Sequence, residues 1–168
     1  MSNSVSRQIV LGIGNPERGD DAAGRKVARL LLQMAPDNVE VTEHDGEATA
    51  LLARLDGAAA AYLIDACQSG APAGTVYRFD VSAAALPQGL GGLSTHGFGL
   101  AEAVELARAL GKLPARCIVY AIEGECFDLG APLTPPASAA VAKVVQRLGS
   151  EIIDDMEPGR KPRCTNPT

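Results

Sequence analysis

The chain is short of aromatic residues and of positive charge. Among its 168 residues there is no Trp, aromatic residues make up 4%, and 15 Lys and Arg face 20 Asp and Glu for a net charge of −5. Without a surplus of cations there is little to neutralise phosphates, which argues against a nucleic-acid partner. The 28 Ala and 18 Gly residues instead predict a core of small aliphatic side chains, as in helices packed closely on a sheet.

The sequence also lacks a recognisable signal peptide, a long apolar run and a C-x-x-C motif. The opening MSNSVSRQ lacks the apolar run of a signal peptide, and no stretch approaches about 18 consecutive apolar residues. The four Cys residues show no C-x-x-C spacing, which argues against a zinc knuckle or a redox motif. We therefore expect a cytoplasmic protein with free thiols and no membrane partner.

Apolar runs alternate with helical stretches along the chain. The predicted strands are Ile9–Gly14, Val39–Glu43, Ala60–Asp65, Thr75–Phe79 and Arg116–Ile122, and the predicted helices are Asp21–Ala35, Glu47–Leu55, Gly97–Leu110 and Pro136–Leu148. This order predicts a single α/β domain over residues 1–153, with a largely parallel sheet covered by helices on both faces. Residues 154–168 have little to bury and are predicted to form a flexible tail. In such a sheet the site lies beyond the carboxyl ends of the strands.

A glycine-rich segment from Gly12 to Gly24 follows the first predicted strand. It begins as G-x-G, but Glu17 stands where a dinucleotide-binding loop needs glycine, and Pro16 lacks an amide donor, so no nucleotide is expected. The segment instead brings Asp20 and Asp21 to the start of a predicted helix. One Asp can cap that helix, which leaves Asp21 as a candidate functional carboxylate; a purely structural role for both is the alternative.

Asp65 closes the most apolar predicted strand. A carboxylate there costs several kcal/mol unless it is paired, hydrogen-bonded or bound to a metal, and the structural alternative is a cap of the following turn. Cys67 lies two residues later, but nothing in its sequence context marks an activating base. We interpret Cys67 as a small buried residue and not as a nucleophile.

The chain has two His residues, one after a predicted strand and one at the end of a predicted loop. His96 opens a predicted helix, where the helix dipole disfavours imidazolium and so favours a neutral, metal-ligating ring; a local hydrogen bond is the structural alternative. His44 follows a strand and is interpreted as a solvated turn residue. Together, Asp21, Asp65 and His96 form a plausible open site for a borderline divalent metal such as Zn, Ni or Fe.

The order and spacing of these motifs resemble those of the [NiFe]-hydrogenase maturation endopeptidases. The family's opening pattern, G-x-G-N-x-x-x-x-D-D/E-x-x-G, is similar to residues 12–24. Its second motif is an apolar strand that ends in D-A, which is similar to residues 65–66. Residues 96–100 are similar to its H-x-x-G-L motif, and residues 130–135 are similar to its G-x-x-L-S/T-P motif. A D-G turn after the second strand is similar to residues 45–46. The resemblance covers about residues 8–148. Some relatives carry Glu where Asp21 stands, and residues 123–128 depart from the frequent E/Q-P form.

The resemblance implies both a fold and a function. The fold is a three-layer α/β/α domain, phosphorylase/hydrolase-like, with a five-stranded sheet in which one strand is antiparallel; Thr75–Phe79 is the candidate for that strand. Members of the family cleave a C-terminal extension from the hydrogenase large-subunit precursor after nickel insertion. Asp21, Asp65 and His96 match the residues thought to recognise the nickel, which the substrate supplies, so these three are the expected catalytic and metal-binding residues. No organic cofactor is implied, and we expect a monomer.

Two other functions share part of this pattern. The peptidyl-tRNA hydrolases open with a similar G-x-G-N-P, but they need a T-R-H-N context and a basic rim for tRNA, and this chain has neither. A non-catalytic, metal-sensing chaperone of the immature large subunit is separated from the protease only by whether the partner is shortened. That alternative stays open at the level of sequence.

Overall fold

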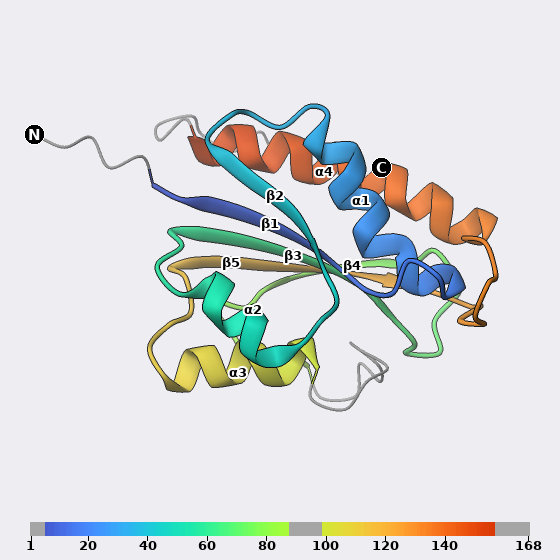
Figure 1. Cartoon of the computed structure of the whole chain (residues 1–168), viewed down its shortest axis with the longest axis horizontal. Coiled ribbons are helices and arrows are strands. Elements are labelled where there is room, and N and C mark those ends of the chain that lie inside the picture. The colour runs from blue at the N-terminus through green and yellow to red at the C-terminus, as the bar shows by residue number, and fades with distance from the viewer. Residues whose placement is uncertain (1–5, 88–98, 157–168) are drawn as a thin grey trace, which may run out of the picture.

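A five-stranded sheet in the order β2-β1-β3-β5-β4 runs through the middle of the protein (Figure 1). The computed structural model describes residues 6–87 and 99–156. Its strands are β1 (Gln8–Ile13), β2 (Val39–His44), β3 (Ala60–Cys67), β4 (Val76–Asp80) and β5 (Arg116–Glu123). Neighbouring strands are parallel except for β4, which pairs antiparallel with β5. The predicted sheet, including its one antiparallel strand, is confirmed.

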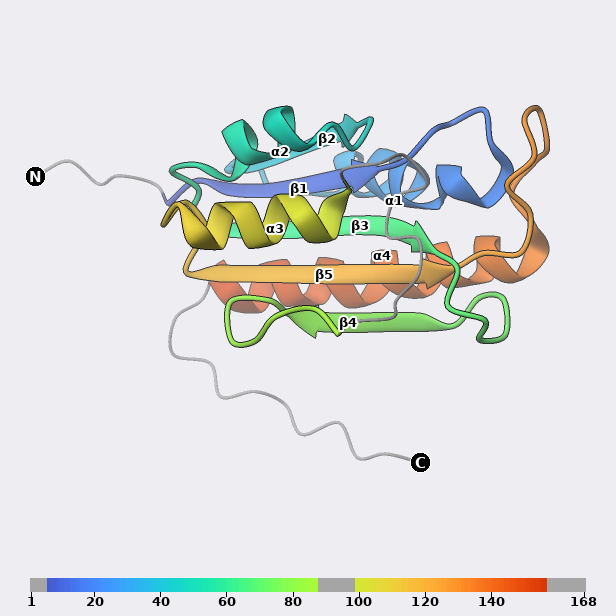
Figure 2. The same ribbon diagram turned by 90° about the horizontal axis from the view of Figure 1, so that it is seen from below.

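Helices cover both faces of this sheet and complete the predicted three layers (Figures 1 and 2). The first face packs against α1 (Ala23–Leu32) and α4 (Pro135–Met156), and the second against α2 (Ala48–Leu55) and α3 (Leu100–Ala109). Strands enclosed on both sides read as continuous apolar runs. Accordingly, all six residues of β1 and all eight of β3 are buried, and Asp65 is one of them.

Two glycines of the 12–24 segment bring α1 against the carboxyl ends of β1 and β3. A Cβ at Gly24 would lie 2.3 Å from the carbonyl oxygen of Ile64 and 2.4 Å from that of Ile13. Gly14 has a φ of +137°, and a Cβ there would lie 1.9 Å from the carbonyl oxygen of Asp21. The motif therefore serves close backbone packing, and this packing places the turn that carries Asp21 beside the strand ends.

The start of the first helix differs from the prediction. A 3₁₀ turn, η1 (Gly19–Ala22), precedes α1, and neither η1 nor α1 has a side-chain cap. The expectation that an Asp caps this helix is therefore wrong, because the side chains of Asp20 and Asp21 bind elsewhere. The 3₁₀ turn holds both residues close to the sheet instead.

The last helix is longer than predicted. α4 continues to Met156, so the tail boundary at residue 154 falls inside the helix. Asp155 accepts hydrogen bonds from the Tyr62 hydroxyl and from Arg116, which fixes the end of α4 to β3 and β5. The rest of the predicted tail, residues 157–168, lies outside the described residues. Among the residues described, no helix is long and apolar enough to span a membrane.

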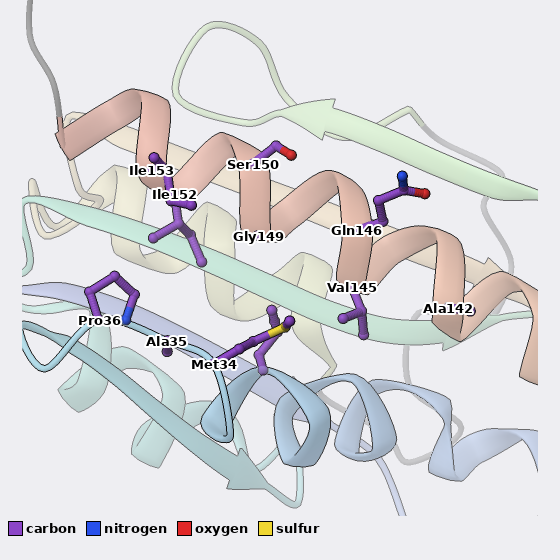
Figure 3. A pocket seen from close by; sticks show the side chains of 11 residues that line it. Met34, Ala35, Pro36, Ala142, Val145, Gln146, Gly149, Ser150, Ile152 and Ile153 are labelled. Carbon is purple, nitrogen blue, oxygen red and sulfur yellow. The ribbon is translucent and has the colours of Figure 1, made fainter.

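An apolar groove of about 380 Å³ lies between the end of α1 and the last turns of α4, lined by Leu31, Met34, Val145 and Ile152 among others (Figure 3). α1 begins beside the carboxyl ends of the strands and runs back along the sheet, so this groove lies toward the opposite end. It is separate from the region that Asp21 and Asp65 share.

Candidate functional site

Asp65 is a buried carboxyl with one oxygen left free. It is 1% exposed, and its Oδ1 accepts a hydrogen bond of 2.8 Å from the backbone N–H of Ala66. Its Oδ2 is also buried and has no hydrogen-bond partner among the residues that the structure describes. Burial, together with the nearby negative charge of Asp21, raises the pKa of Asp65 to about 8. At neutral pH the group is therefore largely protonated.

Asp21 approaches the same region from η1. It is 5% exposed, and its Oδ2 accepts a hydrogen bond of 3.1 Å from the backbone N–H of Asn15. The sheet register pairs Gly12 with Ile64, so the turn after β1 passes next to the end of β3. The structure thus brings Asp21 and Asp65 together at the carboxyl ends of β1 and β3.

His96 falls within residues 88–98 and lies outside the described part of the chain. The helix that follows it, α3, packs on the sheet face that includes Leu63 and Cys67 of β3. Alternation along a strand assigns the intervening odd-numbered Asp65 to that same face. Within the ranges 6–87 and 99–156, no three His, Cys, Asp or Glu residues are grouped closely enough to hold a metal. The three-residue site therefore stays a prediction.

Asp20 has a role that the sequence did not reveal. Its carboxylate is fully buried and accepts hydrogen bonds from the N–H groups of Glu125 (2.9 Å) and Cys126 (3.2 Å) and from the N–H (2.7 Å) and hydroxyl (2.9 Å) of Thr134. These four bonds fasten the connection between β5 and α4 to η1. Asp20 therefore holds in place the turn that carries its neighbour Asp21.

Glu123, the last residue of β5, is a second buried carboxylate that sequence reasoning missed. It accepts hydrogen bonds from the N–H (2.8 Å) and hydroxyl (2.8 Å) of Ser69, from the N–H of Gly70 (3.0 Å) and from the thiol of Cys67 (3.3 Å). Burial alone would raise the pKa of Glu123, but these hydrogen bonds outweigh it and leave the pKa lowered. Its only signal in the sequence was its place at the end of an apolar strand.

Cys67 is inert in this setting. Its side chain is buried, and burial, reinforced by the hydrogen bond to Glu123, raises the pKa of the thiol far above the neutral range. A protonated, inaccessible thiol is a poor nucleophile. The interpretation of Cys67 as a small buried residue is confirmed.

His44 is not the solvated turn residue that we expected. It is the last residue of β2, its side chain is 11% exposed, and its Nδ1 accepts a hydrogen bond of 2.9 Å from the N–H of Gly46. Burial lowers the pKa of His44, against the opposing effect of Asp45. The ring therefore stays neutral and serves to shape the D-G turn after β2.

Comparison with known proteins identifies the family of this chain. A family model described as hydrogenase maturation protease matches residues 26–151, well over half of the chain. The hydrogenase expression/formation protein HupD of Thiocapsa roseopersicina is 27% identical over 143 residues, which cover 82% of this chain. The match spans 64% of that relative, just under two thirds of its length.

Solved structures share the fold. The hydrogenase maturating endopeptidase HybD from Escherichia coli superposes with a TM-score of 0.75 at 24% identity, covering 89% of this chain and 93% of its own. The [NiFe] hydrogenase maturation protease HycI from Thermococcus kodakarensis superposes with a TM-score of 0.66 at 20% identity, with the same coverage of 89% and 93%. These structures show the shared fold, and the match to the family model shows that the chain belongs to the hydrogenase maturation protease family.

Proposed function

We propose that this chain is an endopeptidase that removes the C-terminal extension of a [NiFe]-hydrogenase large-subunit precursor after nickel has been inserted. Membership of the family supports a hydrolase that acts on a hydrogenase precursor. The observation that carries the finer proposal is the free, buried Oδ2 of Asp65 at the carboxyl ends of the strands. A buried polar atom without a partner is costly, and a ligand that completes its bonding would offset that cost.

In this proposal Asp21, Asp65 and His96 recognise the nickel that the precursor carries. Carboxylate oxygens and a neutral imidazole suit a borderline divalent cation. Asp65 would release its proton when the cation arrives, because the positive charge stabilises the carboxylate that burial disfavours. A precursor without nickel offers no such charge and leaves Asp65 protonated. Discrimination between the two precursor forms is then a difference of affinities, on the order of 100-fold for one added ligand bond worth a few kcal/mol.

The same residues provide the groups for hydrolysis. Once the nickel is held at this edge, the peptide that follows it lies close to Asp21 and Asp65. An ionised carboxylate within hydrogen-bond reach of a water can act as its general base. Asp21 is already oriented by the Asn15 N–H, which leaves its second oxygen available for that water. The proposal requires neither a nucleophilic Ser nor the inert Cys67.

The test mixes the protein with nickel-loaded and nickel-free large-subunit precursor and follows the precursor by intact mass. We expect the mass of the C-terminal extension to be lost only from the nickel-loaded form. Equal cutting of both forms would refute nickel recognition. Complex formation without cutting of either form would favour the metal-sensing chaperone. Asp65→Asn, which keeps the acceptor for Ala66, is the matched inactive control.

A further inference from the structure

A cationic pocket adjoins the turn that carries Asp21. It has a volume of about 230 Å³ and lies between η1, the first turns of α1 and residues 131–133. Arg25, Lys26 and Arg29 line it, Pro132 and Leu133 provide apolar surface, and no acidic residue contributes to the lining. Three cations in one small pocket stand out in a chain whose net charge is −5.

Backbone hydrogen bonds join the two walls of this pocket. The N–H of Gly19 donates to the carbonyl of Ala131 (3.1 Å), and the N–H of Gly130 donates to the carbonyl of Glu17 (2.7 Å). The four bonds that Asp20 accepts lie next to these, where the connection from β5 meets η1 (Figures 1 and 2). The pocket is therefore preformed, so a ligand does not have to order its walls.

The cations differ in how they are engaged. Arg25 and Arg29 both pair with Glu43, at 3.4 Å and 2.5 Å, and Arg25 also donates to the carbonyl of Gly14. Lys26 is exposed and has no ion-pair partner among the described residues. One carboxylate against three cations leaves the pocket positively charged, with Lys26 free to meet an incoming anion.

We propose that this pocket binds an acidic side chain of the precursor, on a residue within a few positions of the bond that is cut. This inference rests on the proposed function. Ala22, which lines the pocket, directly follows Asp21, so a peptide that lies across the site continues into the pocket after only a few residues. The cations match the carboxylate, and Pro132 and Leu133 pack against the methylene groups that carry it. The pocket thereby selects among precursors by sequence, whereas the carboxylates of the site respond to the metal.

The experiment compares Lys26→Glu with Lys143→Glu, an identical charge reversal at an exposed position of α4 that does not line the pocket. Both are assayed for cutting of nickel-loaded precursor and for binding of that precursor. We expect Lys26→Glu to raise KM and the dissociation constant on the order of tenfold, with a weaker dependence on salt than the wild type, and Lys143→Glu to match the wild type. Replacing the acidic residues near the cut with their amides should abolish the difference between Lys26→Glu and the wild type.

Three results would overturn the inference. One is equal behaviour of the two variants, another is a Lys26 effect that survives amide replacement, and the third is an effect that disappears only when the precursor's C-terminal carboxylate is amidated. The proposed function fails separately, by the absence of cutting in the wild type. Because binding is measured independently of cutting, the two failures can be told apart.

Discussion

Two buried carboxyls, Asp20 in η1 and Asp65 near the end of β3, have opposite surroundings. Asp20 is fully buried and accepts four hydrogen bonds from the connection between β5 and α4. Asp65 is almost as buried, yet it accepts one hydrogen bond and keeps one oxygen without a described partner. Folding therefore explains the first carboxyl completely but leaves the second unexplained. This difference separates a residue that holds the turn of Asp21 in place from one that, in the proposed function, binds a ligand.

Glu123 belongs with Asp20 in this comparison. It too is buried at a strand end, and its two oxygens are both engaged by residues 67–70. Burial at the carboxyl edge is thus not in itself the mark of a functional carboxyl. The free oxygen and the raised pKa distinguish Asp65, and amide substitutions at the three positions can break or sharpen that distinction.

The largest effect on function is expected at Asp65. Asp65→Asn keeps an oxygen for the Ala66 N–H but removes a charge and a metal ligand, so we expect processing of nickel-loaded precursor to fall at least about 100-fold. Stability should be unchanged or increased at neutral pH, because the wild type must take up a proton at Asp65 when it folds and the variant need not. Intact mass and thermal unfolding check the two parts. A melting temperature lowered by about ten degrees would show instead that Asp65 is a structural cap.

Asp20→Asn should have the largest effect on stability. Either orientation of the amide turns its NH₂ group toward a backbone N–H, that of Thr134 or those of Glu125 and Cys126, so a buried donor loses its acceptor. We expect the free energy of unfolding to fall by about 2–3 kcal/mol, measured by urea denaturation. An unfolding curve that coincides with the wild type would contradict the structural role of Asp20.

Glu123→Gln is the milder counterpart of Asp20→Asn. Its amide oxygen can still accept from the N–H groups of Ser69 and Gly70, and the Ser69 hydroxyl can rotate to accept from the new NH₂ group. The free energy of unfolding should fall by only about 1 kcal/mol, with processing within about threefold of the wild type. A loss of processing as large as that of Asp65→Asn would place Glu123 among the residues of the site.

The sequence was sufficient to predict those features of the fold that depend on local residue patterns. Strands enclosed on both faces, such as β3, are recognisable as apolar runs. The three layers, and the place of Asp65 near the end of a buried strand, could therefore be predicted from local pattern. The strand Thr75–Phe79 also followed from local pattern, but its antiparallel direction and the proposed function came from the resemblance. Helix ends were less certain, because the contacts of Asp155 with Tyr62 and Arg116 extend α4 beyond its apolar stripe.

Long-range contacts could not be predicted from local pattern. Asp20 and Asp21 are chemically identical neighbours, and the partner that distinguishes them, Thr134, lies 114 residues after Asp20. The hydrogen bonds that Glu123 accepts likewise come in part from Ser69, 54 residues earlier in the chain. His44 was misplaced because the turn after β2 folds back so that the Gly46 N–H reaches its ring.

The central claim is that Asp65 is a buried carboxyl with no partner for its charge among the residues that the structure describes. It is tested most directly by pH. Its pKa of about 8 in the folded protein exceeds the value near 3.9 of an unfolded chain. Between these values the folded state binds the extra proton, so the wild type should lose stability as pH rises, by at most about 1.4 kcal/mol per pH unit. We predict that the stability of Asp65→Asn relative to the wild type increases from pH 5 to about 8 and is constant above. A difference in the free energy of unfolding that stays constant from pH 5 to 9 would contradict the account.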